Sequence, residues 1–212
     1  MKFIFGLIFD QGIGWKAAWK GPTELEGRLG KLDVGAISRM SLDDLEKVMR
    51  TPKSLHRFPR KVARWLILAS RHIEEGYGGD PAAVWSDKPV ARDLQNRFDD
   101  FPGIDQKKAS MAVNILVRDY GVLGNDALKH LDVSFDIHVR RVFLRTGLVD
   151  RDREEDVVKA ARELNPAYPG ALDLPAWKVG HNWCHYTHPD CANCPLDAVC
   201  PKLTSRAVPR GQ

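Results

Sequence analysis

The sequence predicts an all-α fold, because apolar residues recur at helical spacing and strand signals are nearly absent. Helical spacing is clearest in residues 60–78, where the apolar positions are Val62, Trp65, Leu66, Ala69 and Ile73. This segment ends among glycines, as helices commonly do. The chain has 212 residues, of which 43% are hydrophobic and 28% charged. It is long enough for one large domain or two small ones with a proper core.

Further helices are expected on both sides of this segment. Ser41 is a candidate N-cap for residues 41–50, with Asp44 three positions on as an acidic variant of the capping box. Four other segments have helical periodicity: 90–98, 106–121, 134–147 and 152–165. The remaining pieces are shorter or irregular: a short helix or turn at 80–87, a loop with one turn at 122–133, a lead into a cysteine-rich loop at 174–184 and a frayed tail at 202–212.

Charge and hydropathy narrow the class of protein. The formal net charge is +4, which is compatible with a polyanionic partner without requiring one. No stretch approaches the roughly 20 apolar residues of a membrane span. Residues 1–10 are apolar after Lys2, but the run is short, Asp10 ends it and no cleavage site follows at once. We therefore expect a cytoplasmic location (nucleoid-associated in a prokaryote), where disulfides are disfavoured.

All the cysteines lie in one short segment near the end of the chain. Cys184, Cys191, Cys194 and Cys200 are separated by six, two and five residues. Clustered thiols in a reducing compartment indicate a metal site. Zinc sites usually take their ligands as two close pairs, and here there is one close pair. The uneven spacing favours an iron–sulfur cluster, with zinc as the alternative and structural disulfides a distant third.

A tight turn separates two of the predicted helices. Residues 101–105 read Phe-Pro-Gly-Ile-Asp, in which Phe101 and Ile104 can pin the turn to the core. The helix that follows exposes backbone N–H groups that can bind a phosphate. Lys107 and Lys108 occupy its first turn, where cations oppose the helix dipole. This pattern is typical of a helix-hairpin-helix, although an ordinary helical corner with solvated lysines has the same residues.

A second candidate position is Asp136, at the start of the helix predicted over 134–147. By itself an aspartate there is more often a helix cap than a catalytic group. Arg140 and Arg141 follow one turn later. His138 alone is more often structural than catalytic.

Together the turn, the aspartate and the cysteine segment resemble the endonuclease III family of DNA glycosylases. The cysteine spacing matches that family's [4Fe-4S] loop without a gap, and the resemblance extends from about Phe3 to Cys200. It implies a six-helix barrel packed against a second helical domain that carries the cluster. It also implies that damaged DNA lies across the cleft between them, with the target base flipped out.

The resemblance assigns roles residue by residue. In the family's hairpin register, Lys107 takes the place of the lyase nucleophile, and Asp136 the place of the catalytic aspartate. Gln11, after the apolar first segment, takes the place of the residue that fills the hole left by the flipped base. Gly103, Asp105, Lys108 and Arg140 would then border the DNA. The cluster would hold a loop with basic groups such as Lys202 and Arg206 against phosphates.

The sequence departs from the family in three places. Asp105 replaces the second hairpin glycine, so that its carboxylate either repels DNA or caps the following helix. Residues 121–131 form an apparent insertion, which would reshape the base pocket. The family's segment before the first apolar helix has no counterpart here.

The resemblance predicts two domains, at 10–131 and 132–212, with residues 1–9 joining either. The expected function is removal of a damaged or mismatched base from double-stranded DNA by a monomeric enzyme, with lyase activity through a Schiff base. Two alternatives remain: a monofunctional glycosylase, in which water is the nucleophile, and a nucleic-acid-binding protein without catalysis.

Overall fold

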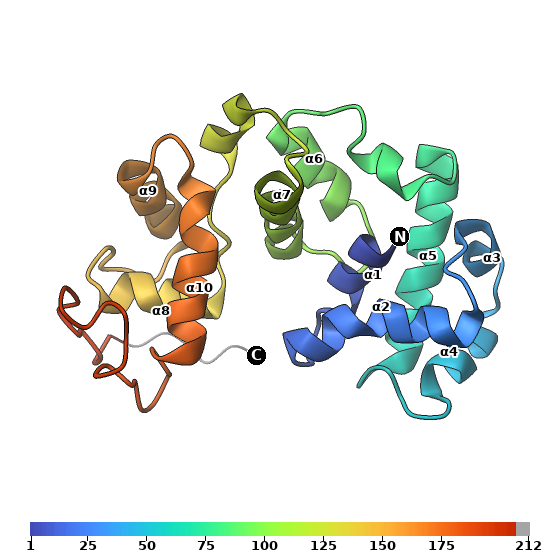
Figure 1. The fold of residues 1–212 in the computed structure, drawn as a ribbon, viewed down its shortest axis with the longest axis horizontal. Helices are drawn as coiled ribbons and strands as arrows, with labels where there is room; N and C mark the ends of the chain where they lie inside the picture. Colours follow the sequence, from blue (N-terminus) through green and yellow to red (C-terminus); the bar gives the residue numbers. More distant parts are fainter. Residues whose placement is uncertain (207–212) are drawn as a thin grey trace. The chain divides into compact units, whose positions relative to one another are not determined.

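The computed structural model describes residues 1–206, and within them all regular secondary structure is helical (Figure 1). The α-helices are α1 (Lys2–Phe9), α2 (Trp15–Leu29), α3 (Val34–Ser38), α4 (Leu42–Arg50), α5 (Pro59–Tyr77), α6 (Ala91–Asp99), α7 (Gln106–Tyr120), α8 (Ile137–Arg145), α9 (Glu154–Leu164) and α10 (Asp173–Asn182). Short 3₁₀ helices are η1 (Pro81–Val84), η2 (Asn125–His130) and η3 (Pro169–Leu172). The predicted all-α class is confirmed.

The chain forms two compact units. Unit 1 comprises residues 1–89 and 93–112, and unit 2 comprises residues 90–92 and 113–212. Residues 1–9 belong to unit 1, and the boundary that follows falls within α7. The domain boundary predicted between residues 131 and 132 stays a prediction.

The core of unit 1 is built around α1. This helix is apolar on every side, and residues 4–9 are all buried. Such a helix must be enclosed by others, and it packs against α2 and α5, while α3 and α4 also pack on α5. The apolar start of the chain is therefore a core helix. Within residues 1–206, no helix is long and apolar enough to cross a membrane.

Unit 2 is organised by α8 and α10, which pack closely together (Figure 1). Gly180 on α10 makes this approach possible, because a Cβ atom there would lie 2.6 Å from the carbonyl oxygen of His138. Val139, Val142 and Phe143 of α8 form the core with apolar residues of α9 and α10. After α10 the described chain consists of turns and loop, which contain the four cysteines.

Candidate functional site

The predicted turn between α6 and α7 is a tight hairpin fixed to the core of unit 1. Phe101 and Ile104 are buried, and the Phe101 ring meets His72 of α5 edge to face at 4.7 Å. Gly103 has a φ of +84°, and a Cβ atom there would lie 2.6 Å from the indole of Trp65. The position therefore requires glycine both for its backbone conformation and for space. The pinning role predicted for Phe101 and Ile104 is confirmed.

Asp105 caps the helix that follows the hairpin. Its Oδ1 accepts a hydrogen bond from the backbone N–H of Lys108 at 2.9 Å. This bond satisfies one of the donors left open at the N-terminus of α7. Of the two roles open to Asp105, the structure shows the helix cap. The carboxylate nevertheless places a negative charge beside the amides that a phosphate would approach.

Lys108 is buried, whereas Lys107 is exposed. Lys108 is 8% exposed, and its Nζ donates a hydrogen bond to the carbonyl oxygen of Gly103 at 2.6 Å. Burial lowers the pKa of Lys108, while Asp105 and Asp10 act in the opposite direction. A lysine nucleophile must be neutral, and burial favours the neutral form; the buried lysine of this pair is Lys108. The assignment of the nucleophile to Lys107 stays a prediction.

Gln11 follows α1 in the same unit. Its backbone N–H donates to the carbonyl of Phe9 at 2.7 Å. Its side-chain Oε1 is buried and has no hydrogen-bond partner within residues 1–206. Unsatisfied buried acceptors are uncommon in proteins, so this oxygen is suited to receive a donor from a ligand.

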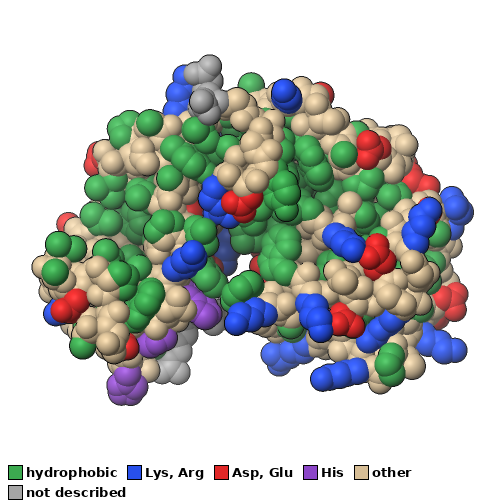
Figure 2. Space-filling model, viewed as in Figure 1, with side chains coloured by type: hydrophobic (Ala, Val, Ile, Leu, Met, Phe, Trp, Pro, Cys, Tyr) green, Lys and Arg blue, Asp and Glu red, His purple; other side chains and the backbone are tan. Residues whose placement is uncertain are grey.

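Two exposed aromatic rings of unit 1 lie beside cations. The guanidinium of Arg57 is 5.3 Å from the ring centre of Phe58, and the ammonium of Lys16 is 5.6 Å from that of Trp15. Figure 2 shows further lysine and arginine side chains over α2 and α4, at the lower right of the view. Cations interleaved with aromatic rings suit a nucleic acid, because phosphates bind the cations and bases stack on the rings.

Asp136 is the N-cap of α8, as the sequence allowed. Its Oδ1 accepts a hydrogen bond from the backbone N–H of His138 at 2.8 Å, and the residue is buried. His138 in turn accepts a hydrogen bond at Nδ1 from Arg141, at 2.9 Å. Because a guanidinium can only donate, the neutral imidazole carries its proton on Nε2. Burial also lowers the pKa of His138.

Arg140, predicted to contact DNA, is engaged within unit 2. Its guanidinium forms a two-pronged ion pair with Asp152 and lies 4.4 Å from the ring centre of Phe135. A phosphate would have to compete with this carboxylate. Contact of Arg140 with DNA stays a prediction, and the structure gives the side chain a partner of its own.

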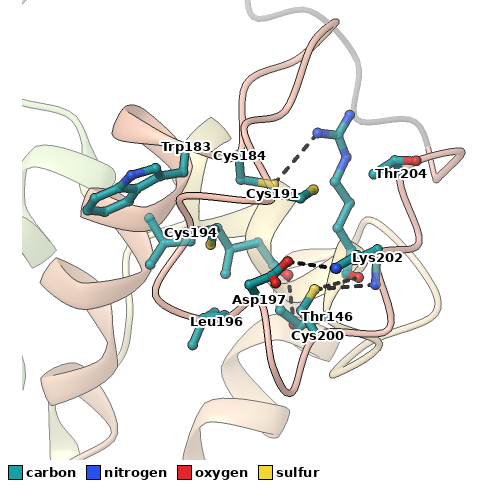
Figure 3. A pocket seen from close by; sticks show the side chains of 13 residues that line it. Thr146, Trp183, Cys184, Cys191, Cys194, Leu196, Asp197, Cys200, Lys202 and Thr204 are labelled. Atoms are coloured by element: carbon teal, nitrogen blue, oxygen red, sulfur yellow. Dashed lines mark hydrogen bonds and ion pairs between the residues drawn. The ribbon is translucent and has the colours of Figure 1, made fainter.

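The four cysteines line one pocket in unit 2, as Figure 3 shows. All four are unbridged and partly buried. Apolar groups complete the lining, among them Val142, Val179 and Leu196. Within residues 1–206, no three cysteine, histidine or carboxylate side chains are close enough together to hold a single metal ion.

Two buried arginines of α8 hold the chain around this pocket. Arg141 donates from Nε to the carbonyl of Cys184 at 2.5 Å. Arg145 donates to the carbonyls of His185 and Tyr186, at 2.6 and 2.8 Å, and approaches the sulfur of Cys184 at 3.6 Å. Burial lowers the pKa of Arg141, and the charge of Asp136 is among the groups that oppose this shift. Sequence reasoning missed Arg145, since an arginine on an apolar helix gives no sign of what it contacts.

Two cations near the cysteines already have acidic partners. Lys202 pairs with Asp197 at 2.6 Å, and Arg206 pairs with Asp150 at 2.9 Å. Arg206 also donates to the carbonyl of Val149 at 2.8 Å. Contact of Lys202 and Arg206 with phosphates stays a prediction. In the structure both side chains contribute to holding the loop, through these ion pairs.

Comparison with solved structures identifies relatives of this fold. An endonuclease III–DNA covalent intermediate matches with a TM-score of 0.69 and 18% sequence identity, over 96% of this chain and 84% of that chain. A thermostable thymine-DNA glycosylase matches with a TM-score of 0.68 and 13% identity, over 97% and 84%. The 8-oxoguanine DNA glycosylase of Thermotoga maritima matches with a TM-score of 0.55 and 18% identity, over 84% and 77%.

These matches confirm the expected resemblance to endonuclease III at the level of the fold. The chain has the all-helical fold of helix-hairpin-helix DNA glycosylases. No protein-family model matches the sequence. No match to a curated protein was found.

Proposed function

We propose that this protein is a DNA glycosylase that flips a damaged or mismatched base out of double-stranded DNA and removes it. The observation that carries the proposal is a buried aspartate at the N-terminus of α8, in a fold shared with DNA glycosylases. The hairpin before α7, the aromatic rings beside cations and the unpaired oxygen of Gln11 supply features that a duplex would use.

The proposed chemistry centres on the bond between base and sugar. A base in a duplex cannot reach a catalytic group, so its nucleotide must first be extruded. As the C1′–N bond breaks, its electron pair leaves with the base and positive charge develops on the sugar. The carboxylate of Asp136 stabilises that charge. The side-chain amide of Gln11 donates a hydrogen bond to, or accepts one from, the base whose pairing partner has been flipped out.

A lyase step would follow if Lys107 is the nucleophile. Its neutral amine attacks C1′, and the base departs with the electron pair of the C1′–N bond and takes up one of the amine protons. The lone pair on the lysine nitrogen then forms the C=N bond while the C1′–O4′ bond breaks and O4′ is protonated, which leaves a protonated Schiff base with the opened sugar. Abstraction of a C2′ proton then expels the 3′ phosphate by β-elimination. The exposure of Lys107 favours a second candidate, a monofunctional glycosylase in which water attacks C1′ and the lysine contacts only phosphate.

We further propose that Cys184, Cys191, Cys194 and Cys200 hold a [4Fe-4S] cluster. Their thiols line one pocket, and so does Arg145, a residue that is 5% exposed. A buried cation without a carboxylate requires another negative charge, because isolated ions are costly to bury. Thiolates bound to iron supply that charge. The cluster would stabilise the loop, and the bond-breaking steps use other residues.

The cluster is tested by metal analysis of the purified protein. We expect about four irons per chain and a yellow-brown colour, as the proposed cluster type requires. One zinc per chain without colour would show a zinc site instead.

The function is tested with duplexes that each contain one damaged or mismatched base, with cut sites read before and after alkali. Asp136→Asn should lose excision by about 10²-fold or more while still binding duplex. Asp33→Asn is the matched control, because Asp33 is also a helix N-cap, accepting from Ala36 at 2.8 Å, and has no proposed chemistry. If Asp136→Asn excises the base at the wild-type rate, Asp136 serves only as the N-cap of α8. A panel on which the wild type removes no base would overturn the glycosylase proposal.

A further inference from the structure

The chain segment that leads into Asp136 is extended and is held at several points within unit 2. The carbonyl of Leu131 accepts a hydrogen bond from the N–H of Gly170 at 2.7 Å. The carbonyl of Asp132 accepts one from the side-chain amide of Asn114 at 2.9 Å. The carboxylate of Asp132 also forms a two-pronged ion pair with Arg162. No helix or strand fixes this segment, so these bonds define its path.

The tether nearest to Asp136 joins Ser134 to Asp173, the first residue of α10. Asp173 Oδ1 accepts two hydrogen bonds from Ser134, at 2.7 Å from the backbone N–H and at 2.5 Å from the hydroxyl. Both residues are buried, and Asp173 is 9% exposed. Burial raises the pKa of Asp173, and the bonds from Ser134 oppose that shift. A buried carboxyl group is costly, and the same turn of α10 could begin with a neutral residue.

We propose that Asp173 is a positioning residue, which fixes the backbone at Ser134 and thereby holds the carboxylate of Asp136 in place for base excision. The inference rests on the proposed function. Ser134 lies two residues before Asp136, and the next residues are already rigid in α8. Freeing Ser134 would therefore release the one side of Asp136 that no helix holds. A displacement of about 1 Å at a catalytic group can cost on the order of 10²-fold in rate.

The substitutions separate the hydrogen bonds of Asp173 from its charge. Asp173→Ala removes both bonds and should lower the single-turnover excision rate by on the order of 10²-fold. Asp173→Asn keeps a carbonyl oxygen that can accept the same two bonds, so it should restore most of the rate. Ser134→Ala removes only the hydroxyl bond and should lower the excision rate by roughly tenfold. Duplex affinity should stay unchanged in all three, because neither residue contacts phosphate in the proposal.

A double-mutant cycle tests whether the two residues act together. If they do, Ser134→Ala should have no further effect on the rate in the Asp173→Ala background. Val157→Ala is the control for lost stability, because Val157 is fully buried in the core of unit 2 and far along the chain from this tether. Rates are compared well below the melting temperature of each variant. If Asp173→Ala does not fold, the test uses the excision rates of Ser134→Ala and Asp173→Asn relative to wild type.

A measurement without catalysis distinguishes this inference from the proposed function. Amide hydrogen exchange at Ser134 and His138 should speed up in Asp173→Ala and remain slow in Asp173→Asn and Val157→Ala. If exchange speeds up in Asp173→Ala but the wild type excises no base, the glycosylase proposal is overturned and the tether between Ser134 and Asp173 still stands. Wild-type excision by Asp173→Ala or by Ser134→Ala would overturn the positioning role. An equal loss of rate and duplex affinity in Asp173→Ala and Val157→Ala would do so too.

Discussion

The ammonium of Lys108 donates a hydrogen bond to the carbonyl oxygen of Gly103 at 2.6 Å and joins the first turn of α7 to the hairpin before it. Asp105, between them, accepts from the backbone N–H of the same lysine. One residue thus ties both ends of the turn. The burial of Phe101 and Ile104, and the backbone hydrogen bond from the N–H of Ile104 to the carbonyl of Phe101 at 3.0 Å, also hold the hairpin.

This buried lysine should make stability depend on pH in alkaline solution. Burial lowers the pKa of Lys108 below its ordinary value of 10.5, so the unfolded chain binds more protons than the folded one. The free energy of unfolding should therefore rise with pH in the window between the folded pKa and 10.5. In Lys108→Met this contribution should be absent. Denaturant unfolding across this window measures the difference in slope, with Lys107→Met as the control. Equal slopes in wild type and Lys108→Met would contradict the shift.

Asp105 should oppose DNA binding through its charge while supporting α7 through its cap. Asp105→Asn keeps an oxygen that can accept from Lys108 and removes the negative charge, so duplex affinity should increase at low salt and the gain should shrink as salt rises. Asp105→Gly removes both the charge and the cap and should also lower the unfolding free energy by roughly a few tenths of a kcal/mol. Titrations at several salt concentrations measure the first effect and denaturant unfolding the second. Weaker binding by Asp105→Asn would show that the carboxylate organises the phosphate site.

Borohydride trapping decides between the two lysines of α7. If Lys107 is the nucleophile, wild type incubated with an abasic-site duplex should form a covalent adduct on reduction. Lys107→Ala should form none, and Lys108→Met should still form it, because the buried ammonium of Lys108 is engaged with Gly103. Trapping that is lost only in Lys108→Met would assign the nucleophile to the buried lysine. No adduct in wild type, with cut sites appearing after alkali, would identify a monofunctional glycosylase.

Arg145 should control how firmly the cysteine loop retains the proposed cluster. Arg145→Leu removes the donors to His185 and Tyr186 and the positive charge at the pocket, so iron per chain should fall and the visible absorbance should decay faster. Arg145→Lys keeps the positive charge but loses the planar guanidinium that donates to two carbonyls. Its iron content and rate of decay should therefore lie between those of wild type and Arg145→Leu. Arg151→Leu, which alters an exposed pair with Asp156 in the same unit, is the control. Iron content and decay equal to those of wild type in Arg145→Leu would exclude this role.

Local sequence signals predicted those helices whose ends are fixed by their own residues. Ser41 accepts from the N–H of Asp44 at 3.1 Å, as the capping pattern predicted. The helix predicted over 60–78 is α5, which ends where Gly78 has a φ of +59°. By contrast, α2 contains Gly21 and Pro22, and in a sequence both residues indicate a break in a helix. It forms because Gly21 lets α2 approach the Phe9 ring, which a Cβ atom there would contact at 2.3 Å.

In the candidate site, too, the features set by neighbouring residues could be predicted and those set by packing could not. Cysteine spacing and the hairpin are local patterns, so the sequence could indicate the pocket and the turn. The helix α10 was not predicted, because Gly180 reads as a break and its reason lies in contact with α8. The tether from Asp173 joins residues 39 positions apart, which no spacing rule relates. Which of two adjacent lysines is buried also depends on the packing of α7 rather than on its sequence.

The loop that contains the cysteines takes its shape from α8. Residues 184–206 have no helix of their own, and side chains of α8 hold the carbonyls of Cys184, His185 and Tyr186. The arrangement of the thiols therefore depends on α8. If they hold the proposed cluster, the iron-free protein should keep a folded α8 and have a protease-sensitive loop, and binding of iron should protect that loop.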